Sequence, residues 1–341
     1  MIILAFETSC DETSVAVLDN EKVLSNIIHS QLFHSEFGGV VPEIASREHL
    51  SRITGITQKA LKEAGKELKE IELICSASEP GLIGALLIGL NYGKSLAVSL
   101  DVPFVPVNHI QAHIYSSFIT DDKPEFPFIS LIVSGGHTLL IKVDDFFRHK
   151  ILGTTIDDAA GEAFDKVAKM LGLGYPGGPL IDKKAKTGNK DFHKFPIASI
   201  KGKPFDFSFS GIKTSVLYFL RNLEKSGKDK SIYIDDICAS FQKAVVDTLY
   251  FKAKKAAELY EIKNISISGG VSANSGLRVR FCELEKSGYR IFIPEADYTT
   301  DNAGMIGITG FYKYRNSSDK EFFRLESLKT KAAPRLDFAN F

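Results

Sequence analysis

A chain of 341 residues exceeds the size at which one hydrophobic core keeps growing, so two lobes are expected. Hydrophobic residues make up 44% of the chain and charged residues 25%, which is typical of a globular protein and excludes a disordered or fibrous one. The formal net charge is zero, so no global basic signal points to nucleic acid, although a local patch would be enough for binding.

The cysteines and the N-terminus indicate a cellular compartment. The four cysteines are scattered without a CxxC pair, which argues against a disulfide framework and a cysteine zinc site. The first residues lack a basic region and reach Glu7 early, so they predict a strand rather than a signal peptide. The apolar run 82–90 contains glycines and precedes Lys94, so we expect no membrane span. A cytoplasmic protein is predicted.

The first half of the chain opens with a predicted β-hairpin. Ile2–Glu7 and Thr13–Leu18 are apolar strands on either side of the polar turn Thr8–Glu12. Further along, Asn108 follows a short strand and can cap a helix. The other elements predicted in this half are helices over Glu43–Ala64 and Leu82–Leu100, and strands over Leu68–Ser76 and Pro103–Val107.

The second half opens with a similar hairpin, Phe128–Val133 and Thr138–Val143, around the turn Ser134–His137. Two hairpins that open two halves predict a duplicated lobe, and the mixture of strands and helices indicates an α/β fold. We expect one lobe over 1–126 and 302–330, the other over 127–301, and a tail over 331–341. Lys183–Lys203 is expected to be a surface excursion. The other predicted elements are helices over Asp157–Leu171, Ile232–Tyr260, Asn274–Lys286 and Asp301–Tyr314, and strands over Ile265–Ser268 and Ile291–Ile293.

Two histidines give the first chemical signal. His109 and His113 lie one turn apart on the predicted helix, so both imidazoles can reach one metal ion. For an arbitrary HxxxH spacing, two ordinary surface or packed histidines are the commoner outcome. Asp301 could supply a third ligand, although a plain helix N-cap is its simpler role. A zinc peptidase helix has Glu after its first His, where this chain has Ile110, and this counts against a peptidase.

Three turns give the second signal. Thr8–Glu12, Ser134–His137 and Ser268–Ser272 each follow an apolar strand and are rich in glycine or serine. Backbone N–H groups in such turns can line an anion, and glycine lets a ligand approach closely. Each turn alone would be an ordinary tight turn, but three of them favour phosphate or nucleotide binding. None has a P-loop lysine or a GxGxxG pattern.

Two further segments have open interpretations. Asp165, within Gly161–Lys166, could hold a hydroxyl or amine of a ligand or could lie on a solvated helix face. The loop Tyr175–Pro179 could contact a ligand or could only end a helix.

These segments together carry a resemblance that runs in order along nearly the whole chain. Its blocks are Phe6–Thr13, Gly38–His49, Asn108–His113, Val133–Thr138, Asp157–Lys166, Phe207–Thr214 and Gly269–Asn274. They resemble the TsaD family, the tRNA N6-adenosine threonylcarbamoyltransferases, formerly called glycoproteases. So many long blocks in register make the resemblance specific.

The resemblance implies an actin/hexokinase-like (ASKHA) fold with duplicated ribonuclease-H-like lobes. It implies transfer of the threonylcarbamoyl group from L-threonylcarbamoyl-adenylate to N6 of the adenosine 3′ of the anticodon, position 37, with release of AMP. The tRNAs are those that read codons starting with A. It further implies tRNA as a partner, a TsaB-like paralogue and a TsaE-like ATPase, and no membrane.

The resemblance also assigns site residues. His109, His113 and Asp301 match metal ligands, which suits one Fe²⁺ or Zn²⁺. Archaeal and eukaryotic relatives have a metal-reaching tyrosine where this chain has Ile132, which favours the bacterial branch and leaves an open coordination position. The positions that match the adenylate site, where ATP or ADP could also bind, are Ile132, Val133, Ser134, Gly135, Gly136, Asp165, Gly178, Asp182 and Asn274.

The sequence leaves the general base, the rival functions and the tRNA-binding surface open. No general base can be named, and Asp11, Glu12 and His137 are only weak candidates. Three rival functions remain: a small-metabolite kinase or phosphatase of the same fold, which leaves the histidine pair idle; a metallopeptidase, which leaves the turns idle; and a scaffold, which should have lost the metal ligands. The densest basic cluster is a candidate for tRNA contact or a solvated loop, and it consists of Lys183, Lys184, Lys186, Lys190, Lys194, Lys201 and Lys203.

Overall fold

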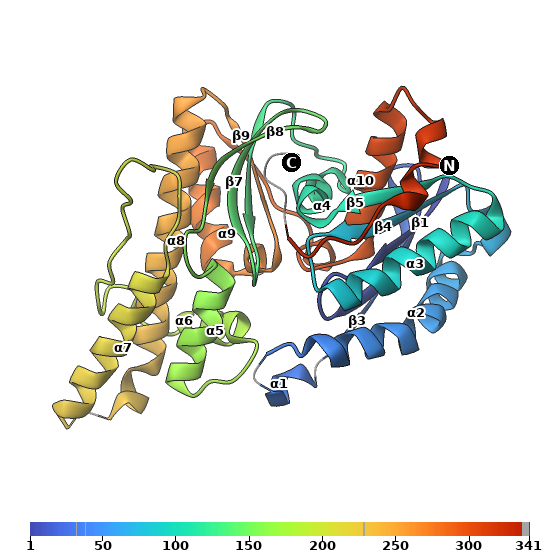
Figure 1. Cartoon of the computed structure of the whole chain (residues 1–341). Coiled ribbons are helices and arrows are strands. Elements are labelled where there is room, and N and C mark those ends of the chain that lie inside the picture. Colours follow the sequence, from blue (N-terminus) through green and yellow to red (C-terminus); the bar gives the residue numbers. More distant parts are fainter. Residues whose placement is uncertain (32, 38, 228, 336–340) are drawn as a thin grey trace. The chain divides into compact units, whose positions relative to one another are not determined.

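The computed structural model describes residues 1–31, 33–37, 39–227, 229–335 and 341. The chain divides into two compact units (Figure 1). Unit 1 consists of Met1–Lys123 and Pro294–Phe341, and unit 2 consists of Pro124–Ile293.

Unit 1 contains a five-stranded sheet in the order β3-β2-β1-β4-β5. The first three strands form an antiparallel meander, and β4 and β5 continue the sheet in parallel with β1. The strands are β1 (Ile2–Glu7), β2 (Glu12–Asp19), β3 (Lys22–Ser30), β4 (Leu73–Glu79) and β5 (Phe104–Asn108). The helices are α1 (His34–Phe37), α2 (Pro42–Ala64), α3 (Ile83–Leu100), α4 (His109–Tyr115) and α10 (Ala303–Asn316), with short 3-10 helices η1 (Leu68–Glu70), η2 (Ser116–Phe118), η6 (Ala296–Tyr298), η7 (Glu321–Phe323) and η8 (Ser327–Lys329).

The strand period of two divides the sheet of unit 1 into two apolar faces. Leu4 and Phe6 of β1 pack with α2 and α3 in one buried cluster. On the other face, α10 approaches so closely that a Cβ on Gly307 would meet Leu18 at 2.3 Å. Small residues therefore let α10 lie flat on the sheet and bring its N-terminal end to β2, where Ala303 N–H donates to Ser14 Oγ at 2.9 Å.

Among the described residues, α3 is the one helix long and apolar enough to pass for a membrane span, which the sequence reading did not expect. Gly93 and Ala97 of α3 are buried, and a Cβ on Gly93 would meet Phe104 of β5 at 3.2 Å. Lys94 on the same helix donates to the Thr330 carbonyl. Packing in the core of unit 1 accounts for the buried face of α3, while Ile83, Leu87 and Val98 of the same helix are exposed.

Unit 2 repeats the sheet of unit 1. Its order is β10-β9-β6-β7-β8, with an antiparallel meander of β6, β7 and β8 followed by parallel β9 and β10. The strands are β6 (Phe128–Val133), β7 (Thr138–Asp145), β8 (Arg148–Thr154), β9 (Asn264–Ser268) and β10 (Arg290–Phe292). The helices are α5 (Ala160–Leu171), α6 (Gly177–Ala185), α7 (Ser210–Lys225), α8 (Ile234–Leu259) and α9 (Ser275–Cys282), with 3-10 helices η3 (Lys230–Tyr233), η4 (Gly270–Ala273) and η5 (Glu283–Ser287). The predicted α/β class and the duplication are confirmed.

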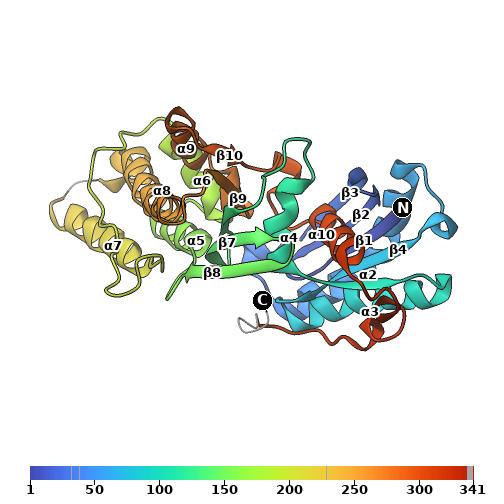
Figure 2. The same ribbon diagram turned by 90° about the horizontal axis from the view of Figure 1, so that it is seen from above.

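The core of unit 2 lies between its sheet and its helices. Leu131 and Val133 of β6 pack against Phe164 of α5 and Phe241 of α8, whose rings meet edge to face at 5.2 Å. Helices α5, α6, α7 and α8 gather on one side of this sheet in both views (Figures 1 and 2). The loops at the carboxyl ends of β6 and β9 are thereby set against the first turns of α5 and α9.

Several element boundaries differ from the sequence expectation. Helix α5 begins at Ala160 rather than Asp157, because the Asp157 carboxylate accepts hydrogen bonds from the hydroxyls of Ser208 and Ser210 instead of starting the helix. The strand expected over Leu68–Ser76 begins only at Leu73, after η1. The expected surface excursion over Lys183–Lys203 begins inside α6. Strands β3 and β8 and helices α1, α6 and α7 were not predicted.

The unit boundaries also differ from the expected lobes. The chain passes from unit 1 to unit 2 at 123/124 and returns at 293/294, so Asp301 lies in unit 1. The returning segment is tied to β3, where Asn26 Nδ2 donates to the Asp297 carbonyl at 3.4 Å. The expected tail also contacts unit 1, since Ala333 N–H donates to the Ser78 carbonyl at 3.0 Å. Residues 336–340 of that tail lie outside the described residues.

Candidate metal centre and nucleotide site

The histidine pair lies on α4, the short helix that follows β5. The predicted cap is confirmed: Asn108 Oδ1 accepts from the N–H groups of Ile110 and Gln111 at 2.9 and 3.1 Å. The cap fixes the first turn of the helix, so His109 and His113 project from the same face. Their rings lie edge to face with centroids 4.7 Å apart, and both are buried.

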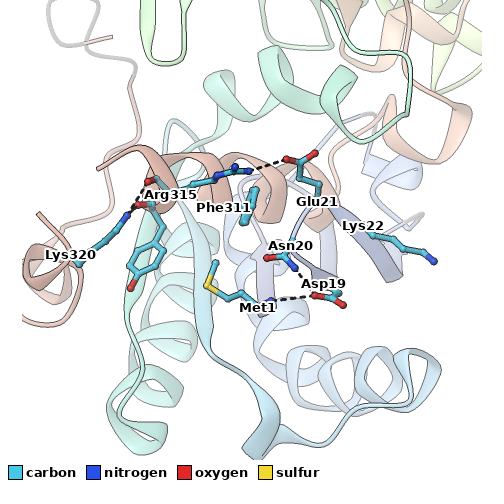
Figure 3. Close-up of a pocket in the computed structure, with 9 residues that line it drawn as sticks. Met1, Asp19, Asn20, Glu21, Lys22, Phe311, Arg315 and Lys320 are labelled. Atoms are coloured by element: carbon cyan, nitrogen blue, oxygen red, sulfur yellow. Dashed lines mark hydrogen bonds and ion pairs between the residues drawn. The ribbon is translucent and has the colours of Figure 1, made fainter. Parts of the chain in front are cut away.

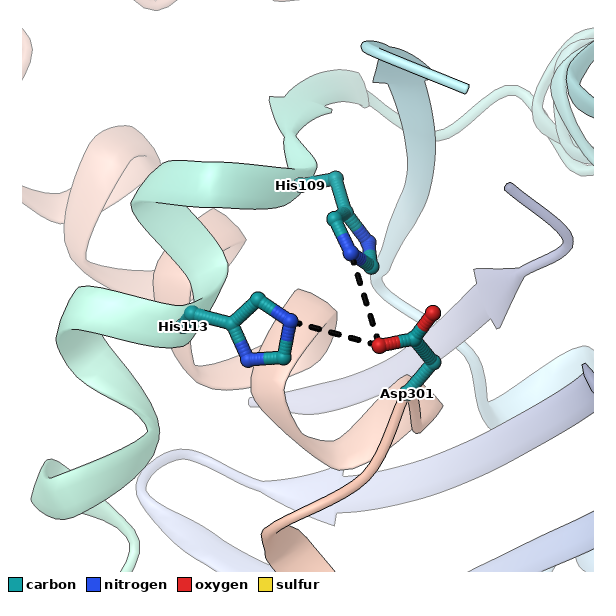
Figure 4. Close-up of side chains that lie close together, drawn as sticks. All are labelled: His109, His113 and Asp301. Atoms are coloured by element: carbon teal, nitrogen blue, oxygen red, sulfur yellow. Dashed lines mark ion pairs between the residues drawn. The ribbon is translucent and has the colours of Figure 1, made fainter. Parts of the chain in front are cut away.

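Asp301 faces both histidines (Figure 4). Its Oδ1 lies 3.5 Å from His109 Nε2 and 3.2 Å from His113 Nε2. The simpler role considered for Asp301, the N-cap of the last helix, is wrong, because Asn302 Oδ1 takes that role and accepts from Met305 N–H at 3.0 Å. The carboxylate of Asp301 is therefore directed at the histidine pair instead of at the helix.

The three side chains suit a metal ion. One donor atom from each lies within 4.8 Å of the others, which one ion can bridge. In the described part of the chain Nδ1 of the fully buried His113 has no hydrogen-bond partner, and its Nε2 faces Asp301 Oδ1 at 3.2 Å. Burial lowers the pKa of His113, so its ring is neutral and its nitrogens can act as ligands. Two imidazoles and one carboxylate form a donor set that fits iron or zinc.

Glu7 at the end of β1 holds the ring nitrogen of His109 that does not face Asp301. Its Oε2 accepts from His109 Nδ1 at 2.9 Å, while its Oε1 accepts from Ser9 N–H at 2.5 Å. This bond turns His109 Nε2 toward Asp301, as a second carboxylate does behind a metal-bound histidine. Burial opposes charge on His109, but the carboxylates of Asp301 and Glu7 outweigh it and raise its pKa to about 9.

The first turn, Thr8–Glu12, adds more acidic groups beside the centre. Burial, followed by the charges of Asp301 and Asp11, raises the pKa of Glu12 well above its usual range. Burial and the same two carboxylates raise the pKa of the Cys10 thiol. So many acidic groups in one buried place create an electrostatic demand for a cation.

Helix α3 holds the beginning of this turn. Thr8 Oγ1 donates to the Ala85 carbonyl at 2.9 Å and accepts from Gly89 N–H at 3.2 Å. Leu82 N–H donates to the Ser9 carbonyl at 2.8 Å. A Cβ on Gly81 would meet that carbonyl at 2.5 Å, so glycine is required for this approach.

In unit 2, the turn Ser134–His137 has an open tip. Ser134 N–H donates to the His137 carbonyl at 2.8 Å, which closes the turn, and Gly135 and Gly136 are exposed. No described atom lies within 4 Å of a Cβ placed on either glycine, so a ligand can reach the backbone there. Helix α5 begins against this turn: Gly161 N–H donates to the Ser134 carbonyl at 3.2 Å. The positive end of the α5 dipole thus lies beside the turn.

Asp165, Asp182 and Asn274 join four helices of unit 2, and Gly178 lies at the start of one of them, α6. Asp165 Oδ1 accepts from Gly177 N–H at 2.7 Å, which ties α5 to the start of α6. Asp182 Oδ1 accepts from Ser275 Oγ at 2.8 Å, which ties α6 to α9. Asn274 caps α9 through Leu277 N–H at 2.9 Å and donates to Gln242 at 2.7 Å. Burial raises the pKa of Asp165. These positions are thus parts of the framework as well as candidate contacts.

The other predicted residues lie in different settings. Ile132 and Val133 are fully buried in β6, and His137 is half-buried at the end of its turn. All seven lysines of the basic cluster are exposed. Two of them have acidic partners at 3.2 Å, Lys184 with Asp235 and Lys203 with Asp206.

One sizeable hollow lies away from both sites. It has a volume of about 720 Å³ and is lined by residues near the start of β1 and the end of α10 (Figure 3). Several of its charges are paired with each other: the Met1 amino group pairs with Asp19 at 3.2 Å and Arg315 pairs with Glu21 at 3.4 Å. The candidate metal centre is at the opposite end of β1, about 20 Å away at the usual rise of a six-residue strand.

Sequence reasoning missed three supporting residues. Glu7 had a detectable signal, since it is an acidic residue that ends an otherwise apolar strand. Asp157 had a weaker one, because it lies in an acidic pair before a helix. His49 had no signal beyond its place in the block Gly38–His49, because its contacts with Cys10 and Thr13 join residues that are far apart in sequence.

Comparison with known proteins identifies similar sequences. The family model described as TsaD: tRNA N6-adenosine threonylcarbamoyltransferase matches residues 22–308. A protein of that name from Thermodesulfovibrio yellowstonii is 51% identical over 325 residues, which cover 95% of this chain and 97% of that relative. Another from Chloroherpeton thalassium is 52% identical over 329 residues and covers 92% of each chain.

Solved structures share the fold at low identity. HypF from T. kodakarensis aligns with a TM-score of 0.63 at 15% identity, over 95% of this chain and 49% of that one. The (R)-2-hydroxyglutaryl-CoA dehydratase component A of Acidaminococcus fermentans aligns with a TM-score of 0.56 at 14% identity, over 93% of this chain and 100% of that one. At such identities these likenesses carry the fold alone, and they confirm the actin/hexokinase-like architecture.

Proposed function

The chain belongs to the TsaD family of tRNA N6-adenosine threonylcarbamoyltransferases, and we propose from this premise which donor, acceptor and metal it uses. It is a tRNA-modifying transferase. The donor is L-threonylcarbamoyl-adenylate, and the acceptor is N6 of the adenosine 3′ of the anticodon, position 37. The observation that carries the metal part of the proposal is the convergence of His109, His113 and Asp301 within 4.8 Å.

The reaction is an acyl transfer from a mixed anhydride. The adenosine amine attacks the carbamoyl carbon, an N–C bond forms, the bond from that carbon to the phosphate oxygen breaks, and AMP leaves as the amine loses a proton. An aromatic amine is a poor nucleophile, so the enzyme must align the two reactants and stabilise negative charge at the carbonyl and phosphate oxygens.

The metal would be held by His109, His113 and Asp301, with Glu7 orienting His109 through the 2.9 Å hydrogen bond. When bound, an Fe²⁺ or Zn²⁺ ion would supply Lewis-acid polarisation and orient oxygen ligands of the donor. Three protein ligands leave coordination positions for those oxygens. Asp11 and Glu12 are candidates to receive the proton of the amine, because they share the acidic surroundings of Asp301.

The nucleotide part of the donor would bind to unit 2. The exposed backbone of Gly135 and Gly136, beside the first turn of α5, suits a phosphate. Asp165 and Asp182 offer carboxylate oxygens that can accept from ribose hydroxyls. The exposed lysines of the segment Lys183–Lys203, which begins in the last turn of α6, are the candidate contact with tRNA phosphates. A TsaB-like paralogue, a TsaE-like ATPase and a cytoplasmic location are further parts of the proposal.

The peptidase alternative accounts for the histidine pair but lacks a general base. A general base would be required immediately after the first histidine, where Ile110 is fully buried. A metabolite kinase would leave the buried donor set of His109, His113 and Asp301 without a role.

The test is formation of the modified nucleoside. The protein and its partners are incubated with unmodified tRNA, threonine, bicarbonate, ATP and the adenylate-forming enzyme, and digested tRNA is analysed by mass spectrometry. The wild-type protein should produce N6-threonylcarbamoyladenosine, and His109→Ala should abolish it. His149→Ala, which changes a half-buried histidine on β8, is the matched control and should keep activity. Absence of product with the wild-type protein contradicts the function, and wild-type rates with His109→Ala contradict the metal role.

A further inference from the structure

His49 on α2 bridges the two limbs of the turn Thr8–Glu12. Its side chain is fully buried, with Nε2 lying 2.9 Å from the Cys10 carbonyl oxygen and Nδ1 lying 2.7 Å from Thr13 Oγ1. The first contact is just before Asp11 and Glu12, and the second is just after them. One imidazole thus contacts the chain on both sides of the two acidic residues of the turn.

The chemistry of the two partners fixes the state of the ring. A carbonyl oxygen only accepts, so Nε2 carries the hydrogen, and in a neutral ring Nδ1 then accepts from the Thr13 hydroxyl. Burial lowers the pKa of His49 and outweighs the opposing effects of the Cys10 carbonyl and the Glu7, Asp11 and Glu48 carboxylates. The ring is therefore neutral at physiological pH, with one donor and one acceptor in use.

Asp11 and Glu12 lie beside the candidate metal centre. Asp301 and Asp11 both raise the pKa of Glu12, and Asp301 also acts on Cys10. The raised pKa of Glu12 depends on how close it lies to Asp11 and Asp301, so the state of this side chain depends on how the turn is held. Helix α3 restrains residues 8 and 9, and Gln31 N–H donates to the Asp11 carbonyl at 3.2 Å. His49 supplies the restraint at Cys10 and Thr13.

We propose that His49 is a positioning residue that holds Asp11 and Glu12 in place for the transfer reaction, by clamping the turn at Cys10 and Thr13. The inference rests on the proposed function. His49 touches neither substrate nor metal in this role, and it acts through the turn. Loss of the clamp lowers the turnover of bound substrates and leaves the affinity for donor and tRNA unchanged.

The first experiment separates kcat from KM in the complete enzyme system. His49→Ala should lower kcat by about 10- to 100-fold, the cost of a misplaced reacting group, while KM for the adenylate and for tRNA should stay within about twofold. His49→Gln should restore most of kcat, because its amide carries a donor and an acceptor on one rigid group. Thr13→Val should lower kcat and Thr13→Ser should not.

The matched control is Thr57→Val, which removes another buried hydroxyl on α2. Thr57 Oγ1 donates to the Ile53 carbonyl of its own helix at 2.7 Å and does not join the turn. The thermal stability of the Thr57→Val variant should fall about as much as that of the Thr13→Val variant, but its kcat should be unchanged. This comparison separates positioning from a general loss of stability.

Two readouts do not depend on activity. In ¹H–¹⁵N spectra of the ring nitrogens, His49 should show a single neutral tautomer protonated at Nε2, which Thr13→Val perturbs. Zn²⁺ titration of the metal-free protein should give the same affinity for wild type and His49→Gln, because the three candidate ligands are untouched.

The outcomes distinguish the inference from the function. If the wild-type system makes no product, the proposed function fails, while the tautomer spectra still test the clamp. If wild type is active, wild-type kcat in His49→Ala overturns the inference alone. Equal losses in His49→Ala and His49→Gln, or a protonated His49 ring at neutral pH, would also overturn it.

Discussion

At the scale of single residues, the candidate metal centre depends on which of two neighbours, Asp301 or Asn302, caps α10. The spacing of His109 and His113 was readable from the sequence, since two residues one turn apart share a helix face. Asp301 was not assignable from the residues alone, because a helix start offers an aspartate a simpler role. Asn302 occupies that role in the structure, and this choice between neighbours leaves Asp301 facing the histidines.

The pKa of His109 predicts proton release when a metal binds. Burial would lower this pKa, but Asp301 and Glu7 raise it from 6.5 to about 9, so the ring of the metal-free protein is protonated at pH 7.5. A metal needs the neutral ring, so binding should release about one proton. The apparent affinity for Zn²⁺ should rise about tenfold per pH unit between pH 7 and pH 9 and level off above. Calorimetric titration at pH 7.5 in two buffers of different ionisation enthalpy measures the proton count.

Glu7→Gln is the informative variant for this prediction. Removal of the carboxylate lowers the pKa of His109, so proton release at pH 7.5 should decrease and the pH dependence of affinity should flatten. The single amide oxygen of Gln cannot accept from both His109 Nδ1 and Ser9 N–H, as the two Glu7 oxygens do, so the orientation of His109 should weaken and Zn²⁺ binding should fall by about 10- to 100-fold at pH 9, where the proton no longer competes. Glu72→Gln, which changes an exposed carboxylate that pairs with the Met1 amino group at the far end of β1, should behave as wild type. A pH-independent affinity in the wild-type protein would contradict the assignment.

At the scale of elements, the sequence predicted those helices whose apolar periods and end signals coincide. The helix expected over Glu43–Ala64 is α2, which ends at Gly65 in the left-handed conformation as such a stop requires. Helix α5 was expected three residues too early, because Asp157 looks like part of a first turn until its partners 51 and 53 residues away are known. Helix α6 was missed because it begins at Gly177 and Gly178, in a segment that signals a helix end.

The approach of α5 to the turn Ser134–His137 predicts a strict requirement for glycine at position 161. A Cβ there would meet the Ser134 carbonyl oxygen at 2.6 Å and the Gly135 backbone at 2.8 Å, and backbone atoms cannot move aside without displacing the turn. Gly161→Ala should therefore weaken binding of the adenylate or of AMP by at least about tenfold. Equilibrium titration of AMP with the purified protein measures the effect.

Gly211→Ala is the matched control, because it also adds a methyl group in the first turn of a helix of unit 2. No described atom lies within 4 Å of a Cβ at Gly211, so this variant should bind AMP as wild type does and fold at least as stably. Equal AMP affinity in both variants would show that the turn carries no nucleotide.

At the scale of the whole molecule, the duplication is the best-predicted feature. Two hairpins with polar tips indicated two related lobes, and the two sheets share one strand order and one pattern of parallel and antiparallel pairing. The boundaries were less predictable, because 294–301 reads as a continuation of the second lobe. Its attachment to β3 depends on Asn26, which is 271 residues from its partner Asp297. Contacts at such separations leave no local pattern in a single sequence.

The lysines of the segment Lys183–Lys203 predict how tRNA binding depends on salt. In the whole chain positive and negative charges balance, so any attraction to phosphates must come from a local surface. Seven lysines are exposed on this segment, and only Lys184 and Lys203 have ion-pair partners assigned in the described part of the chain. Each lysine that contacts a phosphate contributes about 0.7 to 0.9 to the slope of log affinity against log salt. Replacement of the other five, Lys183, Lys186, Lys190, Lys194 and Lys201, by glutamine should flatten the slope accordingly.

The control must change the same charge at another surface of the same protein. Glutamine at five exposed lysines of unit 1, namely Lys22, Lys59, Lys62, Lys69 and Lys331, removes five positive charges from unit 1. If the attraction is local, this variant should keep the wild-type slope and lose little affinity, because distant charges are screened at physiological salt. Filter-binding titrations from about 50 to 200 mM salt, the range where phosphate contacts dominate, measure both slopes. Equal slopes in the wild-type protein and in the variant with glutamine at five lysines of the segment Lys183–Lys203 would place the tRNA on another surface.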